Sequence, residues 1–160
     1  MNETYSARFM QDVTKPPTMF NAFDEPCLEA NRFIEDLSLR LGTPHDPQHA
    51  IRVLTAVFRA LRRKIIPDDS LHIISQLPLI LKGLYVDGWE INEPLSEAKS
   101  FDGFLYDIRN DPQTEDGDFD DDEEARKKIT TVCKALKAFI SYRVFIDVRD
   151  ELPREIAEMV

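Results

Sequence analysis

The sequence has few of the residues that would cross-link it or carry it into a membrane. Its 160 residues contain two cysteines, Cys27 and Cys133, far apart and in no spacing typical of a metal site. We therefore expect free, partly buried thiols in a reducing compartment, the cytoplasm. No apolar run approaches the roughly 18 residues that a membrane span needs, and the first ten residues do not resemble a secretion signal. We expect no membrane partner.

Motifs of common catalytic sites are also missing. The chain has no GxSxG, no P-loop and no GxGxxG sequence. Cys133 falls on a predicted buried helical face and Cys27 has no histidine near it in the sequence, so neither thiol is placed as a nucleophile. We expect that the protein is not an enzyme and that it carries no cofactor.

Positive charge is scarce over the whole chain. There are 20 lysines and arginines against 30 aspartates and glutamates, which gives a formal net charge of -10. This balance repels phosphate-rich partners, so we do not expect a general nucleic-acid binder. An unknown protein partner or self-association remains as the expected mode of action.

The apolar residues that are present follow a helical period. Asp46 followed by Pro47 predicts an N-cap and a first helical residue, which would begin a long helix that runs to about Ile65. Gly42 predicts the end of the preceding helix. The predicted buried stripe of the long helix is Ala50, Leu54, Val57, Phe58, Leu61 and Ile65.

Two prolines fall inside apolar helical patterns. Pro78 and Pro153 each follow a leucine, and a proline fits the first turn of a helix because it needs no hydrogen-bond donor there. We therefore predict that each proline begins a fourth short helix. A proline kink within one longer helix is the alternative.

The same Leu-Pro pairs reveal an internal duplication. Leu77 and Leu152 are 75 residues apart, and carrying that offset back along the chain pairs apolar residues at helix-spaced positions without a gap. The paired residues are Ala50 with Ala125, Leu54 with Ile129, Val57 with Val132, Leu61 with Leu136 and Leu71 with Ile146. Further upstream, Phe33 matches Phe104 at an offset of 71, which indicates a four-residue insertion in the second copy.

These patterns predict an all-α fold in which two tandem pseudo-repeats of about four helices pack as one compact domain, because a unit of ~65 residues alone would be marginal. We predict a loosely ordered N-terminal arm over residues 1–24 and a first repeat over 25–85. A connector over 86–100 leads to the second repeat over 101–160, which contains an acidic loop insertion over 111–124.

Three segments together resemble a known family. LGTPHDPQHAIRVLTAVFRALRRKI, SQLPLILKGLYVDGW and VRDELPREIAEMV are similar to a bacterial family called domain of unknown function 2267, over about residues 28 to 160. The resemblance implies an all-helical, two-copy fold in a soluble bacterial protein. It implies no activity and no catalytic residue. The second copy departs from the family pattern where the acidic insertion replaces the LGxxDP turn.

The long helix of each copy is predicted to be basic and free of acids. At about 100° per residue, its cationic side chains lie opposite the apolar stripe. The candidates for binding a partner are Arg52, Arg59 and Arg63 in the first copy and Lys127 and Lys134 in the second. Two interpretations remain open: a solvated face neutralised by acids of the first helix and the loop, or a basic surface for an anionic protein or nucleic acid.

Tyr85 and Trp89 complete the candidates for partner binding. An aromatic pair on a connector can form an interaction hot spot, while the alternative places Trp89 at the edge of the core of the first repeat.

Metal binding has two weak candidates. His45 and His49 are four residues apart, and a metal-dependent enzyme that uses this pair is the less favoured alternative for the function. His45 precedes the predicted cap and no third ligand is evident, so helix capping by Asp46 is the preferred interpretation. The acidic loop fits an EF-hand poorly because Pro112 takes the first ligand position. We predict that the loop serves the electrostatics of the protein itself and that there is no metal site.

Overall fold

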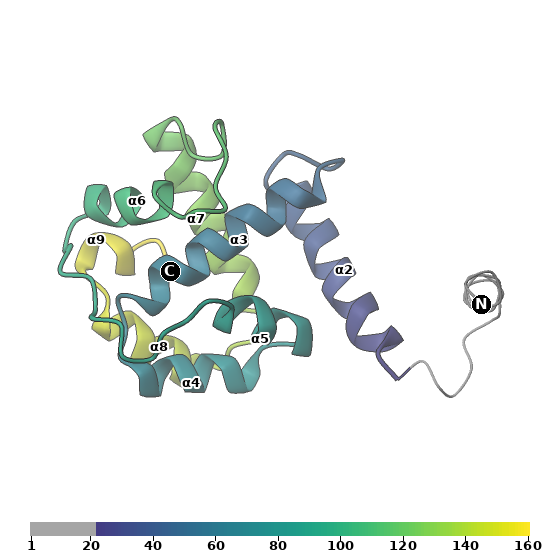
Figure 1. Cartoon of the computed structure of the whole chain (residues 1–160), viewed down its shortest axis with the longest axis horizontal. Coiled ribbons are helices and arrows are strands. Elements are labelled where there is room, and N and C mark those ends of the chain that lie inside the picture. Colours follow the sequence, from purple (N-terminus) through teal and green to yellow (C-terminus); the bar gives the residue numbers. More distant parts are fainter. Residues whose placement is uncertain (1–21) are drawn as a thin grey trace, which may run out of the picture.

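The computed structural model describes residues 22–160, which form eight helices and no strand, so the all-α prediction is confirmed (Figure 1). The helices are α2 Asp24–Arg40, α3 Pro47–Arg62, α4 Pro67–Gln76, α5 Leu79–Val86, α6 Phe101–Arg109, α7 Asp122–Leu136, α8 Tyr142–Glu151 and α9 Arg154–Ala157. The predicted N-terminal arm lies outside the described residues except for its last three. No helix within residues 22–160 is both long and apolar enough to cross a membrane.

Helix α3 lies in the middle of the fold and packs against α2, α5, α6 and α7 (Figure 1). Its start is the predicted one: the Asp46 side chain accepts a hydrogen bond from the backbone N–H of His49 at 2.9 Å, and Pro47 is the first helical residue. Every residue of the predicted stripe is buried. The helix ends at Arg62, three residues before the predicted end at Ile65.

The two prolines separate helices instead of kinking them. Leu77 ends α4 in an extended conformation with ψ 149°, and Leu152 ends α8 with ψ 143°, because the residue before a proline is driven out of the helical region. Pro78 and Pro153 are then the N-caps of α5 and α9. The prediction of new short helices is confirmed. Each proline lies at the N-cap, one residue before the first helical turn in which it was predicted.

The helix boundaries repeat along the chain. Helix α3 begins at Pro47 and α7 at Asp122, 75 residues later, while α4 covers residues 67–76 and α8 covers 142–151. This is the offset that the Leu-Pro pairs give. Superposition of the two copies, and the domain boundaries drawn from it, stay predictions.

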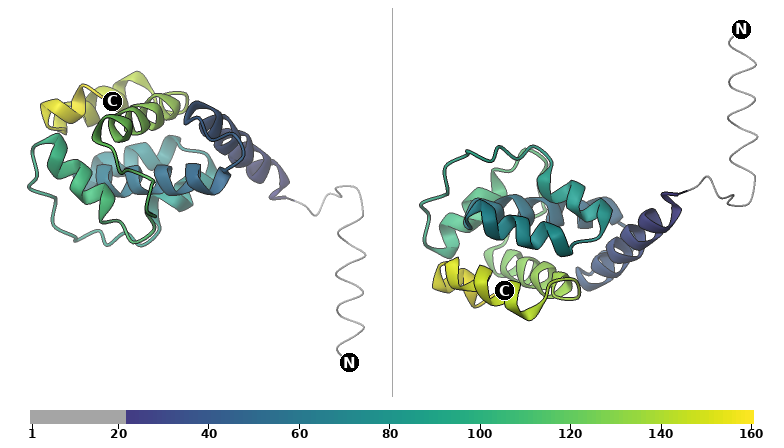
Figure 2. Two further views of the ribbon diagram at one scale, coloured as in Figure 1. Left: turned by 90° about the horizontal axis from the view of Figure 1, so that it is seen from above. Right: turned by 90° about the horizontal axis from the view of Figure 1, so that it is seen from below.

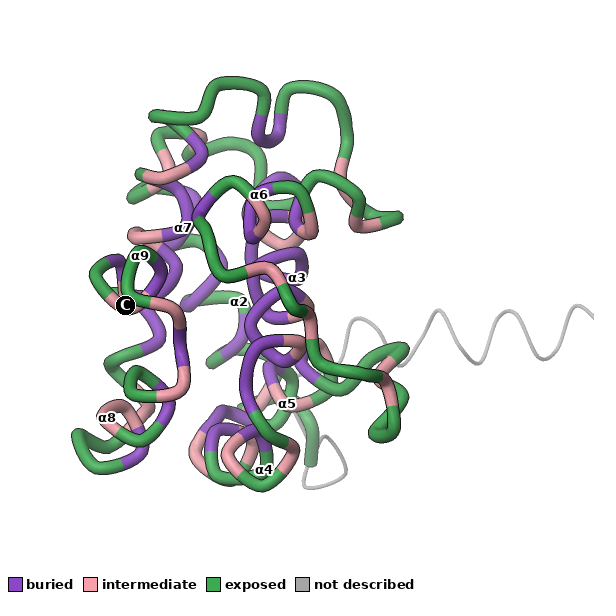
Figure 3. Tube along the Cα trace, turned by 90° about the vertical axis from the view of Figure 1, so that its left-hand side faces the viewer, coloured by how far each residue is buried: buried purple, intermediate pink, exposed green. Residues whose placement is uncertain are grey.

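Side chains of both predicted repeats share one core. The buried residues form a single cluster that draws on all eight described helices, and Figure 3 shows them along the inner sides of α3 and α7. Hydrogen bonds also join the halves: Gln76 exchanges two with Ser141, at 2.6 and 3.1 Å, and the N–H of Ile66 donates to Glu151 at 2.8 Å. The chain is thus one compact helical domain.

Helix α2 lies at the margin of this domain. Ala30, Phe33, Ile34 and Leu37 pack inward, while the N-terminal end of the helix projects beyond the other helices (Figures 1 and 2). Gly42 follows with φ 78°, a conformation that favours glycine and turns the chain toward α3, as predicted.

Candidate interaction surfaces

The three candidate arginines of α3 are all engaged by carboxylates of this chain. Arg52 binds Asp118 through two hydrogen bonds of 2.9 and 3.1 Å. Arg59 donates to both carboxylate oxygens of Asp111 at 3.1 Å and to Asp87 at 3.1 Å.

Arg63 completes this pattern at the C-terminal end of α3. Its guanidinium group lies 3.4 Å from Glu93 and 4.0 Å from Asp107, so its partners come from the connector and from α6. The role of Arg52, Arg59 and Arg63 in binding a partner stays a prediction. Guanidinium groups that already hold carboxylates have little uncompensated charge to offer an anion.

Asp118 is the most enclosed of these acids, with a side chain only 3% exposed. Burial alone would raise the pKa of this carboxyl group. Hydrogen bonds from Arg52, from the backbone N–H of Glu115 and from His49 outweigh burial and lower the pKa to about 2. The acidic loop folds down at this residue so that the Asp118 carboxylate reaches α3.

His49 is oriented by the same carboxylate. Its Nδ1 lies 2.8 Å from Asp118, and since an ionised carboxylate only accepts hydrogen bonds, Nδ1 carries the proton. Nε2 is buried and has no hydrogen-bond partner among the described residues. On the other side of the loop, Lys128 donates to the backbone carbonyl of Asp118 at 2.7 Å. His49 and Arg52 thus fix this loop to α3, and Lys128 fixes it to α7.

No sequence pattern predicts this cluster. His49 and Asp118 are 69 residues apart, and Asp118 is one of many acids in its segment. His45, the other histidine of the predicted pair, is exposed. Among residues 22–160, no three histidine, cysteine, aspartate or glutamate side chains are grouped so that they could hold a metal ion.

Two further cations, one at the end of α3 and one just after it, were not among the candidates, and both are buried. Arg62 donates to the backbone carbonyls of Tyr85 and Asp87 at 2.7 and 2.9 Å, and burial lowers the pKa of its guanidinium group. Lys64 donates to Ser96 Oγ at 2.9 Å and to the carbonyl of Ala98, and burial likewise lowers the pKa of its ammonium group. Both side chains hold the segment that follows α5 against α3.

Ser96 links three parts of the fold through its hydroxyl group. The Ser96 hydroxyl donates its hydrogen to Asp107 at 2.8 Å and accepts one from the Lys64 ammonium group at 2.9 Å. The contact therefore works as a structural link between the connector, α3 and α6.

The candidates of the second copy lie on the surface. Lys127 is exposed and 3.8 Å from Glu123 one turn earlier, and Lys134 is exposed without an ion-pair partner within the described part of the chain. Their role in binding stays a prediction. They do not meet the arginines of α3 in one patch, because those arginines face the loop, the connector and α6.

The aromatic candidates separate into a core residue and an edge residue. Tyr85 is fully buried, its hydroxyl lies 2.8 Å from Ser70 Oγ, and burial raises its pKa to about 12. Trp89 is half-buried, and its ring centroid lies 6.2 Å from that of Tyr85 in an edge-on arrangement. Only Trp89 has surface that a partner could contact.

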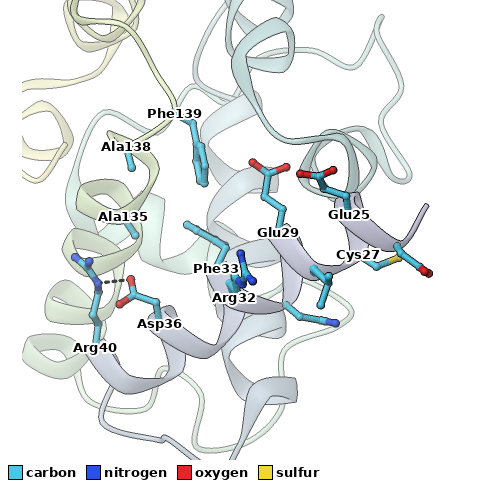
Figure 4. A pocket seen from close by; sticks show the side chains of 13 residues that line it. Glu25, Cys27, Glu29, Arg32, Phe33, Asp36, Arg40, Ala135, Ala138 and Phe139 are labelled. Atoms are coloured by element: carbon cyan, nitrogen blue, oxygen red, sulfur yellow. Dashed lines mark hydrogen bonds and ion pairs between the residues drawn. The ribbon is translucent and has the colours of Figure 1, made fainter. Parts of the chain in front are cut away.

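A groove of about 1000 Å³ opens between α2 and the C-terminal end of α7. We call it the α2–α7 groove, and Figure 4 shows its side chains. Phe33 and Phe139 form its floor, with ring centroids 5.3 Å apart, while Glu25 and Glu29 stand at its edge. The lining combines apolar side chains with charged side chains of both signs.

The outward side of α2 continues from this groove, whose lining includes Leu28 and Arg32. Leu28 and Leu39 are 53% and 63% exposed, and between them lie the exposed side chains of Arg32 and Glu35. We call these four residues the α2 seam. It was not among the predicted binding residues, although the spacing of 28, 32, 35 and 39 indicates one helical face opposite the buried one.

Most of the chain matches a family model. The family model described as "Uncharacterized conserved protein (DUF2267)" matches residues 30–159. A search of curated proteins gives no match. The matched region begins within α2 and covers the other seven described helices, so it includes most of the α2–α7 groove.

Proposed function

This chain belongs to the DUF2267 family, whose description names no activity, and we propose that it is a non-enzymatic interaction protein that docks other protein chains along α2. One observation carries the proposal: the α2–α7 groove and the α2 seam join apolar side chains and exposed charges on a helix at the margin of the domain. Specific interfaces combine these elements, an apolar centre and a polar rim.

The charges of α3 support this function over anion or nucleic-acid binding. The three candidate arginines are held by Asp118, Asp111, Asp87, Glu93 and Asp107. A phosphate group would have to displace these carboxylates, and the net charge of -10 would oppose its approach.

The thiols support a non-catalytic role in the cytoplasm. Cys133 is buried, and burial raises the pKa of its thiol to about 12, which keeps it protonated and unreactive near neutral pH. Cys27 is a free thiol on the surface of α2, a state that a reducing compartment preserves.

Chemical cross-linking of the full chain in an extract of its host tests this function. Changing both Leu28 and Leu39 to glutamate should lower the yield of cross-linked protein species at least about tenfold, since each change places a charge in the docking surface. The matched control changes Leu71 and Leu79 to glutamate, because these leucines are 51% and 54% exposed on α4 and α5. Equal loss in both variants, or no loss in either, would contradict docking along α2.

A further inference from the structure

We propose that the α2 seam binds the α2 seam of a second copy of this chain, with the two helices antiparallel. This inference rests on the proposed function, because it names the protein that docks along α2. Leu28, Arg32, Glu35 and Leu39 are separated by four, three and four residues, so they lie within about 60° of one another around the helix.

The seam faces away from the core of its own protomer. Ala30 and Leu37, on the opposite side of α2, are 7% and 0% exposed, while Leu28 and Leu39 are more than half exposed. The helix stands at the margin of the domain, so no other described helix covers this face (Figure 2). Leu28 and Leu39 are eleven residues apart, which is about three helical turns, so one apolar side chain lies at each end of this exposed face.

The order of residues along the seam makes it complementary to itself in one orientation. When two copies run antiparallel about a twofold axis between residues 33 and 34, Leu28 meets Leu39 of the second copy. In the same register Arg32 meets Glu35 of the second copy, and each contact occurs twice. A parallel pair in register would instead place Arg32 against Arg32 and Glu35 against Glu35, which repel each other.

Among residues 22–160, the two charges of the seam have no ion-pair partner. Neither Arg32 nor Glu35 lies within 4.0 Å of an opposite charge of these residues, whereas Arg40 on the same helix binds Asp36 at 2.7 Å. Self-association would therefore form two ion pairs without breaking any that residues 22–160 make.

The contact between two α2 helices would be small, so we expect the dimer to be weak. Helix α2 has 17 residues and is about 25 Å long, so two such helices bury an area near the lower limit of about 1000 Å² for a specific interface. We expect a reversible dimer with a Kd on the order of 10 μM, which exchanges between this state and other partners.

Sedimentation velocity of the full chain over a range of concentrations tests the inference. The wild type should shift from monomer to dimer, and each of the single variants Arg32→Glu and Glu35→Arg should weaken dimerisation at least about tenfold. An equimolar mixture of these two variants should recover dimerisation as a heterodimer, because every pair across the seam then has opposite charges. The double variant with both changes should dimerise like the wild type.

The alternatives have separate outcomes. A wild type that stays monomeric up to about 1 mM, or a dimer that the charge variants do not weaken, would overturn self-association through the seam. If the wild type is monomeric but the Leu28 and Leu39 variant still loses cross-linked species, the proposed function stands and the occupant is another protein. Circular dichroism of each variant establishes that the exposed substitutions leave the fold intact.

Discussion

Asp118 shows how one residue can decide the conformation of a whole loop. Its carboxylate accepts hydrogen bonds from Arg52 and His49 of α3, and its backbone carbonyl accepts one from Lys128 of α7. A buried carboxylate costs free energy unless its partners compensate for lost hydration. Here the partners more than compensate, since they hold the pKa below its ordinary value.

This pKa predicts a dependence of stability on pH. The pKa of Asp118 falls from 3.8 to about 2 on folding, so its stabilisation is complete above pH 4 and is lost as the pH falls toward 2. We expect Asp118→Asn to lower the free energy of unfolding by about 2 kcal/mol at pH 7. Below pH 4 the free energies of unfolding of the variant and the wild type should approach each other, because the wild type loses this stabilisation. Urea unfolding at several pH values measures this difference.

Asp116 provides the control for this prediction. It lies two residues away in the same loop and is exposed, so Asp116→Asn should change the free energy of unfolding by less than about 0.5 kcal/mol at every pH. A difference for Asp118→Asn that stayed constant between pH 7 and pH 2.5 would show that its carboxylate is not ionised through pairing in the folded state.

At the level of the helices, the sequence predicts what local chemistry determines. The start of α3 follows from Asp46 and Pro47, and its buried face follows from a 3.6-residue period. The partners of the arginine side chains could not be predicted from these local patterns. Periodicity places Arg59 opposite the stripe, but whether that side meets water or Asp111 depends on a loop 52 residues away.

In the short helices, the 3.6-residue period does not identify the buried residues. Leu71 matches Ile146 in the 75-residue offset, yet it is 51% exposed, and Ile73 supplies the core contact of α4 instead. In a helix of ten residues, the choice of the inward side depends on which neighbour it packs against, here α8 and α5.

The stripes of α3 and α7 predict the cost of removing a core leucine. Leu61 and Leu136 are 6% and 4% exposed and line the same small apolar pocket between the halves. Leu61→Ala and Leu136→Ala should each lower the free energy of unfolding by ~2 to 5 kcal/mol, measured by urea denaturation. The exposed Leu71→Ala should cost less than about 1 kcal/mol. A loss that small at Leu61 or Leu136 would mean that the stripe does not form the core.

At the scale of the whole molecule, the two predicted repeats depend on each other. They share one apolar core, and Gln76 and Ser141 join α4 to the start of α8. The arginines of the first half are neutralised largely by Asp118 and Asp111 of the second. Each half alone would expose apolar surface and leave these charges unpaired.

This interdependence predicts a single unfolding transition. Trp89 is the only tryptophan and lies between the halves in the sequence, so its fluorescence reports the environment at Tyr85, while far-ultraviolet circular dichroism reports all helices. The two signals should give the same urea midpoint within error. Separate midpoints would show that the halves unfold independently. The Leu136→Ala variant should move both signals together.

The segment between Asp87 and Ser100 has no helix, and such segments are where proteases usually cut. Here Lys64 holds Ser96 and Ala98, and Gly103 leaves no room between Ala98 and the start of α6. A protease must draw an extended stretch of chain into its active site, and this stretch cannot leave without withdrawing a buried ammonium group from its acceptors. We therefore expect the stretch that contains Ser96 and Ala98 to resist digestion while the domain is folded, so that cleavage there would report the opening of the domain.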